Sequence, residues 1–382
     1  MRRSDERMLT THVGSLPRPQ EVVDQLFAQD RDELTDRAAF DEVMRAAVAE
    51  TVSKQAEAGV DIVSDGEMSK ISYATYIRHR LSGFTPGDAP RATPLDLDEY
   101  PEFRDSLARS GATPRYQRPI CTGPIAPTDT SLLAADLAHL REAVDDAGVV
   151  TEAFMNAASP GVIAVFQPNQ YYETHDAYLE ALSEAMKPEY EAIVAAGFLL
   201  QVDCPDLAMG RHITFRDASE AEFLRNAEAQ VEALNAALAD VPAESVRLHV
   251  CWGNYEGPHH HDIELARIVE IVLRAKPAGL LIEGANPRHA HEWMVWKDVP
   301  LPDDKVLIPG VIDTTTNFIE HPQLVAERIC RYADVVGRER VIAGTDCGFG
   351  TFAGFGAIHP TICWGKLRAL SDGAALASEQ LW

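Results

Sequence analysis

The chain has 382 residues, of which 46% are hydrophobic, so it can bury a large core. It carries 34 basic against 59 acidic residues, and the formal charge of −25 opposes broad contact with nucleic acid or an anionic membrane. We find no apolar run of the ~18 residues that a membrane span needs, and the first residues are charged where a signal sequence would be apolar. We therefore expect a cytoplasmic protein that acts on small molecules.

Short β-rich runs alternate with amphipathic helical stretches along the whole chain. This alternation predicts βα units and a parallel sheet that is covered on both faces. We expect a (β/α)8 TIM barrel, with a doubly wound open sheet as the alternative. The eight expected strands are residues 9–13, 60–64, 161–166, 198–203, 246–251, 279–283, 305–313 and 340–346.

A ninth run, residues 117–125, competes for the eight places in the barrel. We assign residues 161–166 to the barrel and expect 117–125 to form an extra strand outside the main sheet. The Pro-, Asp- and Arg-rich composition between residues 84 and 116 predicts an irregular insertion, which we place around residues 84–125. Residues 1–382 are expected to form a single catalytic barrel domain.

Polar or reactive side chains follow nearly every expected strand. They are Ser15, Glu67, Asp203, His249 with Cys251, Glu283, Asp313 and Cys347. In a (β/α)8 barrel the carboxyl ends of the strands surround one mouth, where such enzymes hold their active sites. The pattern therefore predicts that these chain-distant groups converge.

Four of these residues offer nitrogen, oxygen and sulfur ligands, namely His249, Cys251, Glu283 and Cys347. Zinc accepts this donor set in tetrahedral geometry, whereas thiolates argue against magnesium and calcium. Six cysteines are too few for a disulfide scaffold in a cytosolic chain, which favours metal binding, catalysis or core packing. The alternative chemistry is a nucleophilic Cys347 or Cys251 activated by His249.

Six motifs in chain order resemble the signatures of the catalytic barrel of cobalamin-independent methionine synthase. They are "TTHVGSLPRP", "VSDGE", "LQVDCPDL", "LHVC", "LLIEGANPR" and "GTDCGFGT", and they extend from about residue 9 to about residue 352. Full-length members carry an additional N-terminal barrel of similar size. The chain is too short for two barrels and so resembles the single-barrel branch, which also includes epoxyalkane:coenzyme M transferases.

The resemblance implies that His249, Cys251, Glu283 and Cys347 are zinc ligands. It also places Gly14 and Ser15 near the carboxylate of the acceptor amino acid. Glu67 and Asp203 would lie near its ammonium group. Each of these residues also has a purely structural alternative: Ser15 or Glu67 as a helix cap, and Asp203 as a partner of backbone amides.

Two departures from the family pattern affect the expected mechanism. After the fourth strand the chain reads "DCPD" where the family typically reads D-E-P-A, which places Cys204 and Asp206 at altered positions. Within "GVIDTTTN" the family's proton-transferring histidine is replaced, at about Thr315. The usual proton route is therefore in question.

Residues for the alkyl donor are less well defined by the sequence. Trp252 and Tyr255 follow the His-x-Cys pair and offer aromatic faces to a pterin ring, although packing beneath the mouth is an equal alternative. Tyr73 and Asp313 are further candidates for catalysis or donor binding. Basic residues that would meet a polyglutamate tail are only scattered, at Arg18, Lys70, Arg211 and Arg288.

These observations predict a zinc-dependent thiol S-alkyltransferase. The expected reaction is methyl transfer to homocysteine or a similar thiol through a zinc-bound thiolate, as in methionine biosynthesis. Opening of an epoxide by coenzyme M is the alternative within the same chemistry. A zinc-dependent hydrolase and a binding protein with structural zinc are the alternatives from other classes.

Overall fold

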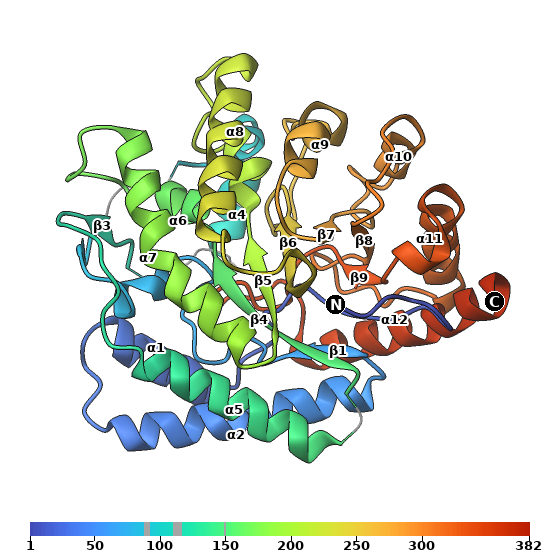
Figure 1. Ribbon diagram of the computed structural model, residues 1–382, viewed down its shortest axis with the longest axis horizontal. Coiled ribbons are helices and arrows are strands. Elements are labelled where there is room, and N and C mark those ends of the chain that lie inside the picture. The colour runs from blue at the N-terminus through green and yellow to red at the C-terminus, as the bar shows by residue number, and fades with distance from the viewer. Residues whose placement is uncertain (88–91, 110–116, 149) are drawn as a thin grey trace.

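The computed structural model describes residues 1–87, 92–109, 117–148 and 150–382. Its centre is a seven-stranded sheet in which all neighbouring strands run parallel, in the order of the chain (Figure 1). The strands are β1 (Ile62–Ser64), β4 (Glu152–Ala158), β5 (Leu199–Asp203), β6 (Val246–Val250), β7 (Gly279–Ile282), β8 (Val306–Ile312) and β9 (Gly344–Thr345).

Residues 9–13 close this sheet into a barrel. Thr10 forms a parallel bridge with Ala343 beside β9, and Thr11 forms one with Ile62 in β1. The Thr11 amide donates to the Ala343 carbonyl at 2.8 Å, and the Ile62 amide donates to the Thr10 carbonyl at 3.0 Å. The first expected strand therefore lies between the last and the first strands of the sheet, and the predicted (β/α)8 architecture is confirmed.

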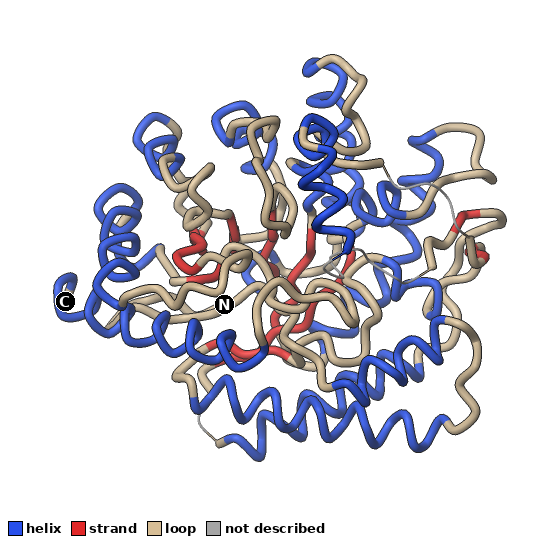
Figure 2. The backbone as a smooth tube through the Cα atoms, turned by 180° about the vertical axis from the view of Figure 1, so that it is seen from behind, coloured by secondary structure: helices blue, strands red, loops and turns tan. Residues whose placement is uncertain are grey.

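Helices surround the strands on the outside of the barrel (Figure 2). The longer ones are α1 (Gln20–Asp30), α2 (Arg37–Glu57), α5 (Ser131–Ala147), α7 (His175–Ala195), α8 (Glu220–Ala237), α9 (Leu265–Leu273), α11 (Pro322–Val336) and α12 (Pro360–Leu381). Two shorter ones are α6 (Pro160–Phe166) and α10 (Val295–Asp298). Short 3-10 helices are η1 (Thr75–His79), η2 (Pro205–Leu207), η3 (Met209–Arg211), η4 (Ala243–Ser245), η5 (Glu292–Met294) and η6 (Arg338–Arg340).

The prediction that residues 161–166 form a barrel strand is wrong. They lie in helix α6, and the barrel strand at this place is β4, which precedes them. The helix begins where Ser159 accepts a hydrogen bond from the amide of Val162 at 2.9 Å, with Pro160 as the first helical residue. A capping serine followed by proline is a strong helix start, and it overrides the β preference of the apolar run.

The run at residues 117–125 lies outside the barrel, as expected. Its strand β3 (Ile120–Cys121) pairs antiparallel with β2 (Phe84–Thr85) in a separate two-stranded sheet. The predicted irregular insertion also contains two short helices, α3 (Leu95–Glu99) and α4 (Pro101–Arg109). Residues 88–91 and 110–116 of the insertion lie outside the described part of the chain.

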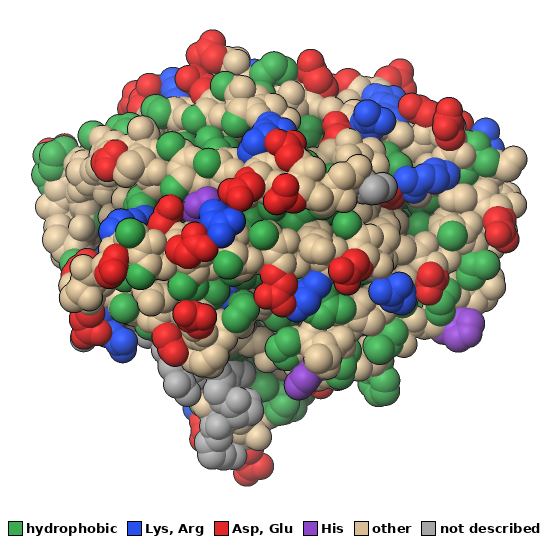
Figure 3. All heavy atoms as spheres, turned by 90° about the horizontal axis from the view of Figure 1, so that it is seen from below, with side chains coloured by type: hydrophobic (Ala, Val, Ile, Leu, Met, Phe, Trp, Pro, Cys, Tyr) green, Lys and Arg blue, Asp and Glu red, His purple; other side chains and the backbone are tan. Residues whose placement is uncertain are grey.

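The face of the molecule seen in Figure 3 carries acidic and basic side chains that are interspersed with one another. On α2, Arg45 pairs with Glu42 at 2.7 Å and Lys54 pairs with Glu50 at 2.5 Å. In the described ranges, no helix is long and apolar enough to cross a membrane.

Candidate metal centre and substrate cavity

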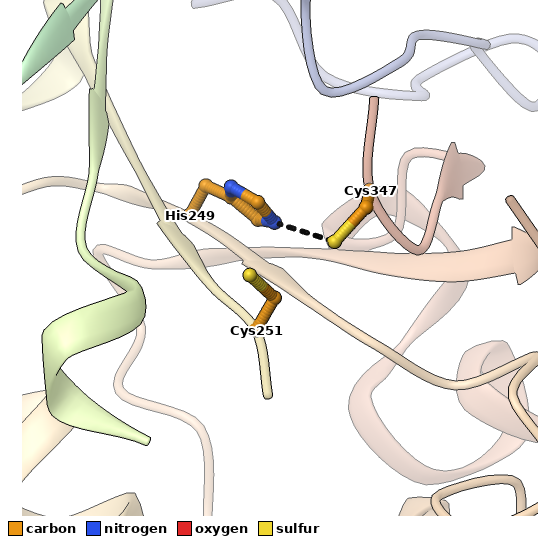
Figure 4. Close-up of side chains that lie close together, drawn as sticks. All are labelled: His249, Cys251 and Cys347. Carbon is orange, nitrogen blue, oxygen red and sulfur yellow. Dashed lines mark hydrogen bonds between the residues drawn. The ribbon is translucent and has the colours of Figure 1, made fainter. Parts of the chain in front are cut away.

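His249, Cys251 and Cys347 form a compact cluster at the carboxyl ends of the strands (Figure 4). His249 is in β6 and Cys251 follows it two positions later, so both side chains leave the same face of the strand. Cys347 follows β9. The three ligand atoms lie within 4.8 Å of one another, and the Cys347 sulfur is 3.8 Å from Nε2 of His249. The structure thus brings together three of the four predicted ligands.

Glu283, the fourth predicted ligand, borders this cluster from the end of β7. Its Oε1 atom lies 3.8 Å from the sulfur of Cys347 and accepts a hydrogen bond from the amide of Trp252 at 2.9 Å. Asp346 fixes the loop that carries Glu283, because its carboxylate accepts the amides of Gly284 and Asn286 at 2.8 and 2.6 Å. The loops after β7 and β9 are therefore held together next to the cluster.

The cluster is buried and its groups shift one another's protonation. The hydrogen bond with Cys347 and the charge of His249 lower the pKa of the Cys251 thiol well below its usual value. Burial alone would lower the pKa of His249, but Cys251 and Asp203 raise it to about 10. Burial, together with the negative charges of Asp346 and Cys251, raises the pKa of Glu283 to about 8 against the opposing charge of His289.

This donor set fits a zinc ion. Two sulfurs, one imidazole nitrogen and one carboxylate oxygen are typical zinc ligands, and a buried divalent cation would favour the deprotonated forms of these thiols and of this carboxyl group. Zinc also needs His249 to present a free nitrogen. Nδ1 of His249 lies 3.2 Å from Oδ1 of Asp203, so a proton on Nδ1 leaves Nε2 available on the side of Cys347.

A cavity of about 280 Å³ opens beside the cluster. His249, Cys251 and Cys347 line it together with three of the residues predicted to bind the acceptor, Ser15, Glu67 and Asp203. Much of the remaining wall is apolar and consists of Val13, Ala92, Pro94, Leu97, Val165, Phe166, Pro205, Met209, Ile213, Phe352 and Phe355. The cavity therefore combines a polar region at the strand ends with a large apolar surface.

Glu67 and Asp203 bring two buried carboxylates to the polar region. Oε2 of Glu67 has no hydrogen-bond partner among the residues that the structure describes, and Nη2 of Arg18 lies 3.9 Å from it. Burial and the charge of Asp203 raise the pKa of Glu67 to about 8. Asp203 accepts hydrogen bonds from Asn156 and Gln201, each at 3.0 Å. This arrangement suits a ligand that carries positive charge and hydrogen-bond donors.

Gly14 and Ser15 lie where the first strand reaches the cavity. Gly14 has φ +142°, and a Cβ atom on it would lie only 2.2 Å from Oδ1 of Asn156. Glycine is therefore required here by both backbone conformation and space. Ser15 lines the cavity, and it does not cap α1, which begins at Gln20 after Pro19.

Tyr73 and Tyr255, two of the candidates for catalysis or donor binding, both line the cavity. The ring of Tyr73 lies 5.4 Å from that of Phe166 and 5.8 Å from that of Phe352. The hydroxyl of Tyr255 donates to Asp96 at 2.7 Å. Tyr73 therefore belongs to an aromatic wall, whereas Tyr255 is tied to the insertion.

Trp252 and Asp313 are not among the described residues that line the cavity. The indole of Trp252 is fully buried, stacks on His289 at 4.1 Å and donates to a backbone carbonyl at 2.7 Å. Asp313 accepts the amides of Thr315 and Thr316 at 3.1 and 2.9 Å, which stabilises the turn after β8. Both residues thus make structural contacts here, and their proposed roles in catalysis or donor binding remain predictions.

Sequence reasoning missed three polar residues that organise the site. Asn156 and Gln201 lie within β4 and β5 and hold Asp203. Asn254 lines the cavity and joins three loops, because it donates to Gly348 at 2.7 Å and accepts from Thr314 at 3.0 Å. The sequence offers one signal for such residues, which is a polar side chain inside an apolar strand, as in "LLQVD". A buried amide there needs hydrogen-bond partners.

Comparisons of sequence and of structure with known proteins point to the same family. Residues 8–89 and 142–359 match the family model described as the catalytic domain of cobalamin-independent synthase. The chain is 23% identical over 377 residues to a protein named methionine synthase from Saccharolobus solfataricus, covering 97% of this chain and 95% of the relative. It is 25% identical over 342 residues to one from Sulfolobus acidocaldarius, covering 89% and 85%.

Solved structures show the same fold. A B12-independent methionine synthase from Shewanella sp. W3-18-1, in complex with selenomethionine, superposes with a TM-score of 0.73 at 18% identity, covering 98% of this chain and 99% of that one. A putative vitamin-B12 independent methionine synthase from Listeria monocytogenes superposes with a TM-score of 0.66 at 19% identity, over 98% and 99% of the two chains. The family model omits residues 90–141, which include most of the insertion. On these matches, the chain belongs to the family of cobalamin-independent synthase catalytic domains.

Proposed function

We propose that the protein is a zinc-dependent methyltransferase that methylates the sulfur of homocysteine and so forms methionine. The observation that carries this proposal is one cavity that contains both a His249–Cys251–Cys347 cluster and two buried carboxylates, Glu67 and Asp203. The names of the relatives point to the same reaction.

The residues of the cluster have distinct tasks in this reaction. His249, Cys251, Glu283 and Cys347 would hold zinc, which supplies a means of keeping the substrate sulfur as a nucleophilic thiolate at neutral pH. Asp203 orients His249 through Nδ1. Glu283 is the one oxygen donor, and we propose that it would be the exchangeable ligand of that ion.

The acceptor is an amino acid in this proposal. Its ammonium group would meet the unpartnered oxygen of Glu67 and the carboxylate of Asp203, while its carboxylate would approach Ser15. These two carboxylates favour homocysteine over coenzyme M, because coenzyme M has no ammonium group to pair with them. In the transfer itself the sulfur loses its proton, a sulfur–methyl bond forms and the bond from methyl to donor breaks.

A second candidate reaction is the opening of an epoxide by a thiol. The apolar wall of the cavity favours it, since a short epoxide needs no charged partner. The attack would form a sulfur–carbon bond and break a carbon–oxygen bond, and the resulting alkoxide would take a proton. Tyr73, which lines the cavity, is the group we assign to that proton transfer.

The test combines metal analysis with a substrate panel. The purified protein should contain about one equivalent of zinc, and Cys347→Ser should lose both metal and turnover. Cys330→Ser, a partly exposed thiol on α11, is the matched control and should keep both. Full turnover by the zinc-free Cys347→Ser protein would refute the proposal.

The panel offers homocysteine or coenzyme M against methyl-folate, methylcobalamin and short epoxides, with the thioether identified by mass spectrometry. S-methyl products from homocysteine support the main proposal, and hydroxyalkyl thioethers support the second. We also propose that residues 1–382 act as one catalytic domain, because the strand at residues 9–13 pairs beside the last strand.

A further inference from the structure

A second group of metal-ligating side chains lies at the rim of the barrel, outside the cavity. It consists of Glu99 at the end of α3 and of His260 and His261 in the loop after β6. Nε2 of His260 lies 2.8 Å from one carboxylate oxygen of Glu99, and Nε2 of His261 lies 2.5 Å from the other. We propose that these three residues bind a divalent cation such as Zn²⁺ or Ni²⁺ and thereby fasten the insertion to the barrel.

The donor chemistry fits such an ion. Two imidazoles and one carboxylate are the ligands of many zinc and nickel sites, and water can fill the remaining positions. The three ligand atoms already lie within 4.8 Å of one another. Bonds of about 2.0–2.1 Å at tetrahedral angles place donors roughly 3.3 Å apart, so only a small outward shift of partly exposed side chains is required.

The histidine loop is held in the necessary conformation by its buried neighbour. His259 has φ +54°, which is rare for a residue with a side chain, and its ring is buried against Asp262 at 2.8 Å. Asp262 is fixed in turn by His289 at 2.9 Å. The rings of His260 and His261 lie 4.3 Å apart, and both direct Nε2 toward Glu99. Two ligands are thus preorganised before the ion arrives.

A metal ion bound by Glu99, His260 and His261 would also affect the wall of the cavity nearby. Helix α3 also contacts this loop through Asp96, which accepts from the hydroxyl of Tyr255 at 2.7 Å and from the amide of His259 at 2.8 Å. Leu97, on the same helix, lines the cavity. An ion on Glu99 would therefore stabilise one wall of the cavity. This inference does not depend on which reaction the cavity catalyses.

Calorimetric titration of the zinc-loaded protein with Ni²⁺ tests the site. We expect one further equivalent to bind to the wild-type chain, with the original zinc retained by metal analysis. The double variant His260→Ala/His261→Ala should lose this equivalent, and Glu99→Gln should weaken it at least tenfold. His291→Ala removes another exposed histidine and should bind as the wild type does. Equal binding by the double variant and the wild type, or no binding by either, overturns the proposal.

Limited proteolysis tests the fastening separately. If Ni²⁺ binds only when α3 is docked on the barrel, it lowers the population of the undocked form that a protease can cut. Ni²⁺ at 100 times its Kd should therefore slow cleavage within α3 and α4 by up to roughly 100-fold. The Glu99→Gln chain should show no such protection at the same concentration. Binding of Ni²⁺ by the wild type without slower cleavage would refute the fastening, even if the metal site itself is present.

Discussion

Nδ1 of His249 lies 3.2 Å from Oδ1 of Asp203, so one carboxylate connects the proposed metal site with the proposed acceptor site. Asp203 lines the cavity with one part of its surface and orients the imidazole with another. The relationship means that acceptor binding and metal binding depend on the same side chain.

The substitution Asp203→Asn should therefore weaken both acceptor binding and metal binding. The amide keeps the shape of the side chain but removes the charge that fixes the tautomer of His249, and loss of such a partner typically lowers metal affinity about 10–100-fold. Competition with a zinc chelator measures this effect. Asp313→Asn, which alters a carboxylate at the turn after β8, should leave zinc affinity unchanged. Unchanged affinity in Asp203→Asn would contradict the orienting role.

Glu67→Gln should make the substrate-free protein more stable at alkaline pH. The pKa of Glu67 is raised from 4.5 to about 8, so the folded chain holds a proton that the unfolded chain has lost between these pH values. Stability from this group therefore falls as pH rises through that window. Glutamine never ionises, and we expect a gain on the order of 1–4 kcal/mol at pH 8.5 that vanishes near pH 4.5.

Denaturant unfolding at the two pH values measures this difference, and an equal effect at both would disprove the assignment. The same Glu67→Gln variant should bind homocysteine more weakly, because it lacks the charge that meets the ammonium group. A rise in KM for the acceptor without a comparable rise for the donor is the expected kinetic result.

Gly14→Ala should disrupt the acceptor region. The new methyl group would lie 2.2 Å from Oδ1 of Asn156, so the Asn156 side chain must move, and its Nδ2 releases the hydrogen bond that it donates to Asp203. We expect a loss of stability of about 2–4 kcal/mol and a rise in acceptor KM of at least about tenfold. Gly148→Ala is the matched control, since Gly148 has φ +69° and nothing within 4 Å of the added carbon, and should cost only about 1–2 kcal/mol. Similar KM values for the two variants would count against the explanation.

Tyr255→Phe should loosen the insertion without altering the chemistry. It removes the hydroxyl that donates to Asp96, a carboxylate that is almost fully buried, at a cost of about 1–3 kcal/mol. We expect a higher KM for the alkyl donor with kcat nearly unchanged. Tyr171→Phe, at a residue that is about half exposed, should change neither value. A large fall in kcat with constant KM would instead assign Tyr255 a direct role in the reaction.

The sequence predicted the barrel and the convergence of the strand ends because both follow from local periodicity and from the geometry of parallel sheets. It failed at residues 161–166, where an apolar run of six residues suits a strand and a buried helix equally well. The true strand, "EAFMNAA", has a weak β pattern, and its place in the barrel is set by pairing with β1 and β5.

The site was predicted where a residue's chemistry is readable from its type, as for His249 and Cys347. It was not predicted where the role depends on a partner far along the chain. Asn156 acts through Asp203, and Trp252 is removed from the cavity by stacking on His289. Glu99 and His260 are 161 residues apart, and their meeting follows from the docking of the insertion.

The pairing of Thr10 with Ala343 has a consequence for biosynthesis of the protein. The segment that carries Gly14 and Ser15 is synthesised long before Ala343, its neighbour on one side. A nascent chain therefore exposes this segment until Ala343 has been synthesised, and the complete pocket forms only after that point.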